Sequence, residues 1–256
     1  MKFSRSSTVD NKWLPLVPGT QLTYEGRANR GTGILPHRIV SVVTDLTKVI
    51  DGIRAVVIWE RDFNEGQMVE SELAFQAQDD DGNVWNVGEY PETYEQGKLT
   101  GADDTWLTGV DRAKAGVLMR AKPQVGAPSY LQGWAPTIEF RDRAQDVKTG
   151  QRVCVNPDRC YTNVLVTDEW NPLDPPDGHQ VKYYAPGIGT IRVEPGQGDQ
   201  DQETLVLVGK VRLSAKALAE ARAEALKEDA RAYKVSKAVY GHTERAKRTA
   251  RVDRPE

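Results

Sequence analysis

The sequence predicts a mainly β protein, in which an antiparallel meander forms a barrel or a strongly bent sheet and a long C-terminal helix follows. Three observations support this fold class. Runs in which polar and apolar residues alternate recur along the chain up to residue 213. Turn sequences such as Asp51-Gly52 separate those runs. The composition then changes at Ser214 to residues that favour a helix.

The clearest β-hairpin spans residues 181–194. Polar and apolar side chains alternate up to Ala185 and again from Ile188, as expected for strands with one buried face. Pro186-Gly187 supplies the turn between them, because proline presets φ and glycine accepts the left-handed conformation. Several other segments have the character needed to pair with this hairpin.

Taken in order, the chain begins with a polar segment, residues 1–12, that we expect to be disordered. The antiparallel β domain is expected over residues 13–213, with a long loop at about 90–127. Within this domain we expect strands at residues 21–25, 38–44, 53–60, 68–77, 84–89, 129–134, 137–140, 142–155, 161–169, 181–185, 188–193 and 203–213.

Residues 214–256 are expected to form the C-terminal helix and a basic tail. Ser214 is a suitable N-cap, residues 215–240 contain no proline, and Gly241 ends the pattern. The apolar stripe of this helix consists mostly of alanine. We therefore expect the helix to pack lightly on the β domain or to project from it.

Composition limits the classes of function. With 39% hydrophobic and 28% charged residues, the chain is typical of a globular protein, and no apolar run is long enough to predict a membrane span. From Lys210 onward there are 13 Lys and Arg against 7 Asp and Glu, whereas the rest of the chain is acidic. The basic tail could contact nucleic acid, but the acidic body and the lack of interleaved aromatic residues argue against that role.

The two cysteines, Cys154 and Cys160, flank a predicted hairpin turn, so a local disulfide is plausible if the compartment is oxidising. A structural zinc site would need histidines to join them, and the chain has only three. We favour the disulfide.

A calcium site is a weaker prediction. Asp79, Asp81 and Asn83 offer oxygen ligands on a tight glycine turn. The same residues are explained by a hairpin turn alone, and Glu89 does not have the spacing of the closing ligand of a calcium loop. No other cofactor is indicated.

A ligand pocket inside the barrel is the second candidate site. Eight-stranded barrels can fill their interior or enclose one small ligand. The candidate lining consists of aromatic residues expected to point inward, although core packing is the default explanation of each of them. They are Tyr24, Trp59, Phe75, Trp85, Trp134 and Tyr183.

Catalytic motifs are missing from the sequence: there is no nucleophile elbow, phosphate-binding glycine loop or His-Glu-x-x-His. Glu70 with Glu72, or Glu89 with Glu92, could act as acid and base if one were buried. Exposed strand carboxylates are the commoner explanation of such pairs.

Four blocks of sequence resemble a widespread, largely uncharacterised group of bacterial exported proteins and lipoproteins. The blocks are residues 13–20, WLPLVPGT; 77–89, AQDDDGNVWNVGE; 169–173, EWNPL; and 182–189, KYYAPGIG. The resemblance spans residues 13–194 and implies an extracytoplasmic β-rich domain without a known activity. The long basic helix is not part of the group's pattern. The sequence from Met1 shows no signal peptide, which leaves a cytoplasmic location open.

Three functions are therefore considered. The first is a non-enzymatic exported β domain that binds a small apolar molecule or a protein partner. The second is a barrel enzyme of the cyclase or isomerase type that uses a buried carboxylate or tyrosine. The third is a structural assembly protein that docks, or forms an oligomer, through its C-terminal helix.

Overall fold

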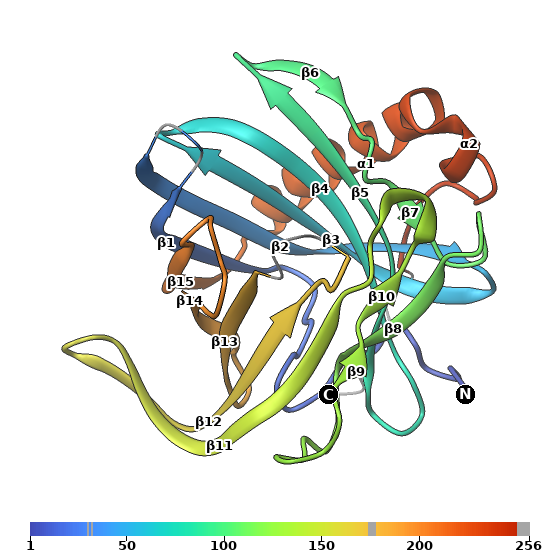
Figure 1. Ribbon diagram of the computed structural model, residues 1–256. Coiled ribbons are helices and arrows are strands. Elements are labelled where there is room, and N and C mark those ends of the chain that lie inside the picture. Colours follow the sequence, from blue (N-terminus) through green and yellow to red (C-terminus); the bar gives the residue numbers. More distant parts are fainter. Residues whose placement is uncertain (30, 32, 174–177, 250–256) are drawn as a thin grey trace.

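Antiparallel strands dominate the fold, as the sequence predicts. The computed structural model describes residues 1–29, 31, 33–173 and 178–249, which form a bent 16-stranded sheet with one long helix across its outer face (Figure 1). The strands are β1 (Thr20–Asn29), β2 (Ile34–Ile50), β3 (Ile53–Asn64), β4 (Gln67–Gln78), β5 (Val84–Glu95), β6 (Lys98–Gly101), β7 (Trp106–Leu107), β8 (Lys114–Met119), β9 (Tyr130–Leu131), β10 (Gly133–Trp134), β11 (Arg143–Asn156), β12 (Arg159–Trp170), β13 (His179–Ala185), β14 (Gly189–Pro195), β15 (Thr204–Arg212) and β16 (Lys247–Arg248). The helices are α1 (Ala215–Val235), α2 (Lys237–Tyr240) and the 3-10 turn η1 (Pro136–Ile138).

The strand order is that of a meander bent almost into a barrel. It runs β10-β8-β5-β4-β3-β2-β1-β15-β14-β13-β12-β11-β9, with β6 and β7 beside β5 and β16 beside β2. The strands at its two ends, β9 and β10, are separated in sequence only by Gln132. At this junction a Cβ on Gly116 would lie 2.3 Å from the carbonyl carbon of Gln132, so only glycine permits so close an approach.

The expected loop at residues 90–127 contains several strand segments, which corrects the sequence prediction. Strand β5 continues through Tyr90 to Glu95, and β6, β7 and β8 all lie within this stretch. Trp106, within this stretch, is buried. The polar composition concealed these strands because β6 is exposed and β7 is only two residues long.

The first twelve residues also differ from the expectation of disorder, because they pack on the sheet. Val9 and Asn11 are buried. The Nδ2 of Asn11 donates to the carbonyl of Gly82 at 2.8 Å, and its Oδ1 accepts from the amide of Trp13 at 2.7 Å. The segment is therefore held to the turn between β4 and β5 and leads directly into the Trp13–Leu16 block.

Helix α1 covers the outer face of the strands β2 to β5 and forms the largest hydrophobic cluster with them. Ser214 caps it by accepting a hydrogen bond from the amide of Ala217. Ala221, Ala225 and Ala232 are buried against side chains such as Phe75. Alanine lets the helix approach the sheet closely, so the thin stripe seen in the sequence produces close packing rather than a projecting helix.

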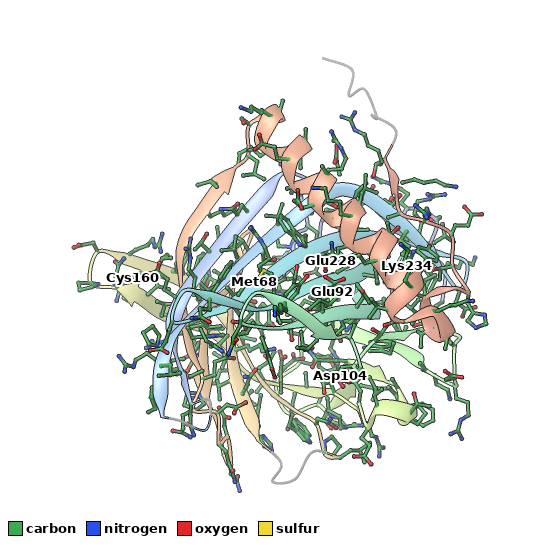
Figure 2. The ribbon with its side chains drawn as sticks, turned by 90° about the horizontal axis from the view of Figure 1, so that it is seen from above. Met68, Glu92, Asp104, Cys160, Glu228 and Lys234 are labelled. Carbon is green, nitrogen blue, oxygen red and sulfur yellow. A yellow bond between two sulfur atoms is a disulfide. The ribbon has the colours of Figure 1, made fainter. Side chains whose placement is uncertain are left out.

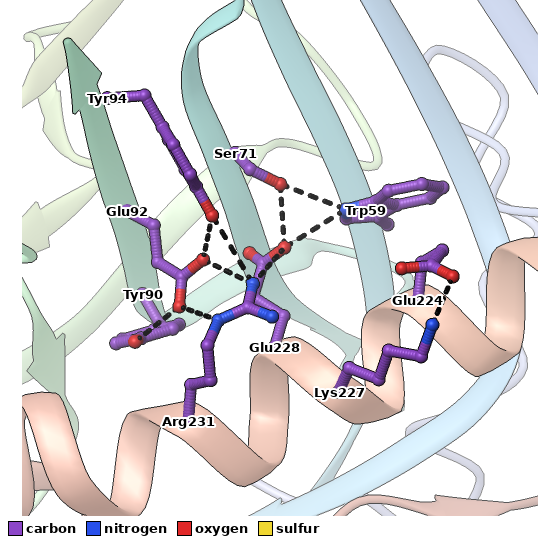
Figure 3. A network of polar contacts seen from close by, with 9 residues as sticks. All are labelled: Trp59, Ser71, Tyr90, Glu92, Tyr94, Glu224, Lys227, Glu228 and Arg231. Carbon is purple, nitrogen blue, oxygen red and sulfur yellow. Dashed lines mark hydrogen bonds and ion pairs between the residues drawn. The ribbon is translucent and has the colours of Figure 1, made fainter. Parts of the chain in front are cut away.

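Buried polar contacts reinforce this interface (Figure 3). Glu92 of β5 accepts hydrogen bonds from Tyr90, Tyr94 and Arg231, the last at 2.8 Å from the guanidinium Nε. Glu228 accepts from Ser71 Oγ at 2.6 Å and from Trp59 Nε1 at 3.1 Å. Seen from above, Glu92 of β5 and Glu228 of α1 lie close together beside the helix (Figure 2).

The chain after α1 also joins the body. Lys48 of β2 is 1% exposed and lies 3.0 Å from Asp229 Oδ1, and its Nζ also donates to the carbonyl of Glu244. Strand β16 pairs with β2. The last part of the expected basic tail, residues 250–256, lies outside the described residues. No helix in the described chain is long and apolar enough to cross a membrane.

The predicted disulfide is confirmed. Cys154 of β11 and Cys160 of β12 are bonded, and the hairpin that they close extends away from the body of the sheet (Figures 1 and 2).

The replacement of Glu228 by glutamine should reduce the loss of stability that occurs as the pH rises from about 5 to about 8. Burial raises the pKa of Glu228 to about 8. The hydrogen bond from Ser71 opposes this rise, and repulsion from Glu92 adds to it. Between about pH 5 and pH 8 the unfolded chain releases a proton that native Glu228 keeps, so stability falls as pH rises, by at most about 1.4 kcal/mol per pH unit from this group.

Urea unfolding at pH 6 and pH 8 measures this slope. E228Q should lose less stability than the wild type between the two values. E224Q, at an exposed position on the same helix, is the matched control and should behave as the wild type. Equal pH slopes in E228Q and the wild type would contradict the prediction.

Candidate ligand-binding cavity

The inner face of the bent sheet lines a partly open cavity of about 310 Å³. Strands from both halves of the sheet contribute to its wall, including β1 to β5, β13, β14 and β15. A second pocket of about 520 Å³ adjoins it, and Glu72 and Glu89 line both. The two spaces therefore meet at these carboxylates. The first volume is at the lower end of the range for small-molecule sites.

One end of the cavity is apolar. The N-terminal block contributes Leu14 and Leu16, and the strands add Leu22, Val43 and Ile58. Trp13 lies behind them in a buried cluster with Val43 and Ile58. The segment before β1 thus closes this end of the sheet with hydrocarbon side chains.

The other end of the cavity carries carboxylates on neighbouring strands. Glu60 of β3 lies directly opposite Glu72 of β4 in the strand register. On β5, Glu89 lies opposite Ala74, two residues from Glu72 on the same face. Like charges placed opposite one another destabilise a sheet, so this arrangement has an energetic cost.

The pKa values of these acids reflect both burial and mutual repulsion. Burial, followed by the charges of Glu89 and Glu60, holds the pKa of Glu72 well above its ordinary value. Burial also raises the pKa of Glu60, although a hydrogen bond from Ser41 opposes the shift. For Glu70, burial and the charge of Asp62 raise the pKa to about 7. Burial and mutual repulsion therefore both disfavour the ionised forms of these carboxyl groups.

Glu89 is held by two donors. Its Oε1 accepts from Asn86 Nδ2 and its Oε2 accepts from Trp106 Nε1 at 3.0 Å. Burial raises the pKa of Glu89, and these hydrogen bonds limit the rise. The two donors fix the direction of this carboxylate at the junction of the two pockets.

Lys182 of β13 lines the cavity and forms an ion pair with Glu169 of β12, with 2.9 Å between Nζ and Oε2. Tyr184 donates to the other oxygen of Glu169 at 3.0 Å. Burial alone would lower the pKa of Lys182, but the charge and the hydrogen bond of Glu169 raise it instead. The ammonium group is thus charged and already paired.

The adjoining pocket is acidic as well. Its lining includes Glu70, Asp104, Glu139 and Asp142, with Ile138 and Phe140 as apolar neighbours. Asp104 and Glu139 are exposed, which places this pocket at the outer side of the acidic end. The negative charge therefore extends from the interior to the surface.

Of the six aromatic residues proposed from the sequence to line a pocket, Tyr24 alone is among the residues that line the interior cavity. Trp59 and Phe75 belong to the cluster under α1, and Trp85 packs against that cluster beside Phe3. Lys114 lies over the ring of Trp134. Tyr183 donates to Glu194. The structure does not bring these six residues together.

The expectation that the acidic pairs noted in the sequence are exposed strand carboxylates is wrong. Glu70, Glu72 and Glu89 line the two pockets. Glu92 has no exposed surface and lies under α1. The alternation of Glu70, Glu72, Ala74 and Gln76 was the available signal, because it puts all four on one face of β4.

The proposed calcium ligands form a hydrogen-bonded turn. Asp79 Oδ1 accepts from the amides of Asp81 and Asn83, and its Oδ2 accepts from Trp85 Nε1 and Asn83 Nδ2. Asn83 Oδ1 accepts from the amide of Ala121. These contacts account for the conformation of the turn without an ion.

Comparisons with known proteins give structural neighbours of low identity. No protein-family model matches the chain, and no curated protein matches it. A putative exported protein with a YmcC-like fold from Bacteroides fragilis is similar over 78% of this chain and 99% of its own, at 16% identity and a TM-score of 0.44. A putative lipoprotein from Parabacteroides distasonis is similar over 79% of this chain and 100% of its own, at 12% identity and a TM-score of 0.36.

The replacement of Lys182 by methionine should destabilise the protein by about 3 kcal/mol, because it leaves the carboxylate of Glu169 buried without its cation. Urea unfolding at pH 7 measures the change. The double variant K182M/E169Q should recover part of the loss. K216M, at an exposed position, is the control and should stay within about 0.5 kcal/mol of the wild type. A K182M variant as stable as K216M would contradict the proposed role of the ion pair.

Proposed function

We propose that the protein is a non-enzymatic exported domain that binds a small molecule in its interior cavity. The observation that carries this proposal is a cavity of about 310 Å³ on the inner face of the sheet, with one end apolar and the other acidic. A cavity left unfilled costs stability, and opposed carboxylates add to the cost. A ligand that fills the space would explain both the cavity and the opposed carboxylates.

Export is supported by the disulfide. Cys154 and Cys160 close a hairpin at the surface, and such bonds form and persist in oxidising compartments. The resemblance of residues 13–194 to exported proteins and lipoproteins agrees with this location.

Docking through the C-terminal helix has less support. The buried side of α1 is occupied by the sheet, where Ala225 and Ala232 have no exposed surface. A protein partner would therefore meet the charged outer side of the helix, in which Lys216 and Lys227 are exposed.

Acid and base catalysis of the cyclase or isomerase type is the second candidate. One observation favours it: burial and neighbouring charge raise the pKa of Glu70 to about 7, close to the value that suits a general acid or base at neutral pH. Under this alternative, a molecule extracted from the cavity would be chemically changed on incubation with fresh protein. Under our proposal it is returned unchanged.

Native mass spectrometry of the protein purified from its own source tests the binding function. The spectrum should show an added mass that is lost on denaturation. The same sample, purified without reductant, should be lighter by two hydrogens than the reduced chain because of the disulfide.

The variant Ala74→Phe should abolish the added mass, because residue 74 lines the cavity and a phenyl ring would fill it. A223F, at an exposed position on α1, is the matched control and should retain the ligand. Cooperative unfolding of A74F shows that the variant is folded. Added mass in A74F equal to that in the wild type would rule out the interior cavity as the binding site.

A further inference from the structure

The carboxylate of Glu72 lacks a partner. Among the described residues, no hydrogen-bond donor and no cation contacts it, and the charges that act on it most strongly come from Glu89, Glu60 and Glu70. It is nevertheless partly buried and lines both pockets. A carboxylate that faces a cavity without a donor or cation is costly to remove from water, so a partner from outside the chain offers a functional explanation.

Three ionisable groups of the same cavity, in contrast, have partners. Glu89 accepts from Asn86 and Trp106. Glu203 lies 2.9 Å from His37 Nε2, and Lys182 is paired with Glu169. The only cation at the cavity wall is therefore engaged elsewhere within the described residues. The charges that act most strongly on Glu72 all come from acidic side chains, and the cation on the facing wall, Lys182, is already paired.

The opposite end of the same cavity has the reverse chemistry. Leu14, Leu16 and Ile58 present hydrocarbon, and none of them can satisfy a polar group. A ligand that fits the whole cavity has to match both ends. It needs an apolar group for the leucine end and a positive charge for the carboxylate end.

We propose that the cavity binds an amphiphilic organic cation, with its hydrocarbon group at Leu14 and Leu16 and its cationic group, such as an ammonium, against Glu72 and Glu60. This inference rests on the proposed binding function and specifies the chemical class of the ligand. The charge-assisted hydrogen bonds of an ammonium group supply the donors that Glu72 lacks.

A metal ion is a poorer match than an organic cation. Within the part of the chain that the structure describes, no three His, Cys, Asp or Glu residues are arranged to hold one. A bare divalent ion would also leave the apolar end of the cavity empty. An ammonium group needs fewer converging ligands and carries the hydrocarbon that the other end requires.

Binding of such a cation should depend on pH. The groups that act on Glu72 are Glu60 of β3, Glu70 of β4, Glu89 of β5 and Glu228 of α1, with Lys182 on the facing wall. A bound cation favours the ionised carboxylate and lowers the pKa of Glu72, so protons are released on binding. Affinity should therefore rise with pH through neutrality, provided that the ligand itself stays charged.

Calorimetric titration with three probes of equal chain length, octylammonium chloride, octanol and sodium octanoate, tests the inference at pH 7 on the full chain. Octylammonium should bind at least tenfold more tightly than octanol, and octanoate should not bind. In E72Q, the advantage of octylammonium over octanol should fall tenfold or more, while octanol binding is unchanged. Titration in buffers of different ionisation enthalpy should show proton release with octylammonium alone.

Two further variants complete the design. E60Q should weaken octylammonium binding as well, and it provides an independent check on the acidic end. E25Q, at an exposed position on β1, is the matched control and should bind all three probes as the wild type does. Octanol binding by E72Q and E60Q shows that the variants are folded.

The cationic inference is overturned if octylammonium binds the wild type no more tightly than octanol, or does not bind. It is also overturned if E72Q and E60Q keep the full preference for octylammonium. Neither result decides the broader function, because added mass on protein from its own source is measured separately. Loss of that mass in A74F combined with a failure of octylammonium would leave a binding cavity with a different ligand class.

Discussion

The packing of α1 on the outer face of β2 to β5 is the interaction on which the rest of the structure depends. Three buried alanines of the helix, Ala221, Ala225 and Ala232, let its backbone approach the sheet. Around them, the pair of Lys48 with Asp229 and that of Glu92 with Arg231 satisfy the polar groups that this approach buries. A large hydrophobic cluster therefore lies outside the bent sheet rather than within it.

This location of the core explains how the inner face can remain partly hollow. A small barrel without an outer layer has to fill its interior with apolar side chains to be stable. Here β3 contributes Val57 and Trp59 to the outer cluster and Ile58 and Glu60 to the interior. The outer contacts stabilise the sheet, and the inner face can then carry Glu60 opposite Glu72. Such departures from a uniformly favourable pattern are expected at functional sites.

The sequence predicts the fold class, most strands, the helix and the disulfide, because these depend on local patterns. Period-two alternation in β4 separates Glu72 from Leu73 and Phe75 whatever the fold. It does not reveal which face is inside. The usual rule that apolar side chains face the interior of a barrel placed Trp59 and Phe75 in the cavity, whereas they lie under α1. The close packing of α1 on the sheet was also underestimated from the sequence, because a stripe of alanine has little hydrophobicity but permits a close approach.

The candidate site could not be derived from the sequence for the same reason. Glu60, Glu72 and Glu89 come from three strands, and their proximity depends on the register of β3, β4 and β5. An isolated glutamate on a strand is typical of an exposed face. Only the pairing of the strands, with the helix on the outer side, turns these three residues toward one cavity.

The most direct test of this account is urea unfolding of a truncated chain, residues 1–213, which lacks α1 and all that follows. If the core lies between the helix and the outer face, the truncated chain should show no cooperative unfolding transition, because Val57, Leu73 and Phe75 lose their cover. A cooperative transition with native-like tertiary circular dichroism would contradict the account. It would show that the interior of the sheet holds a core sufficient to fold the protein alone.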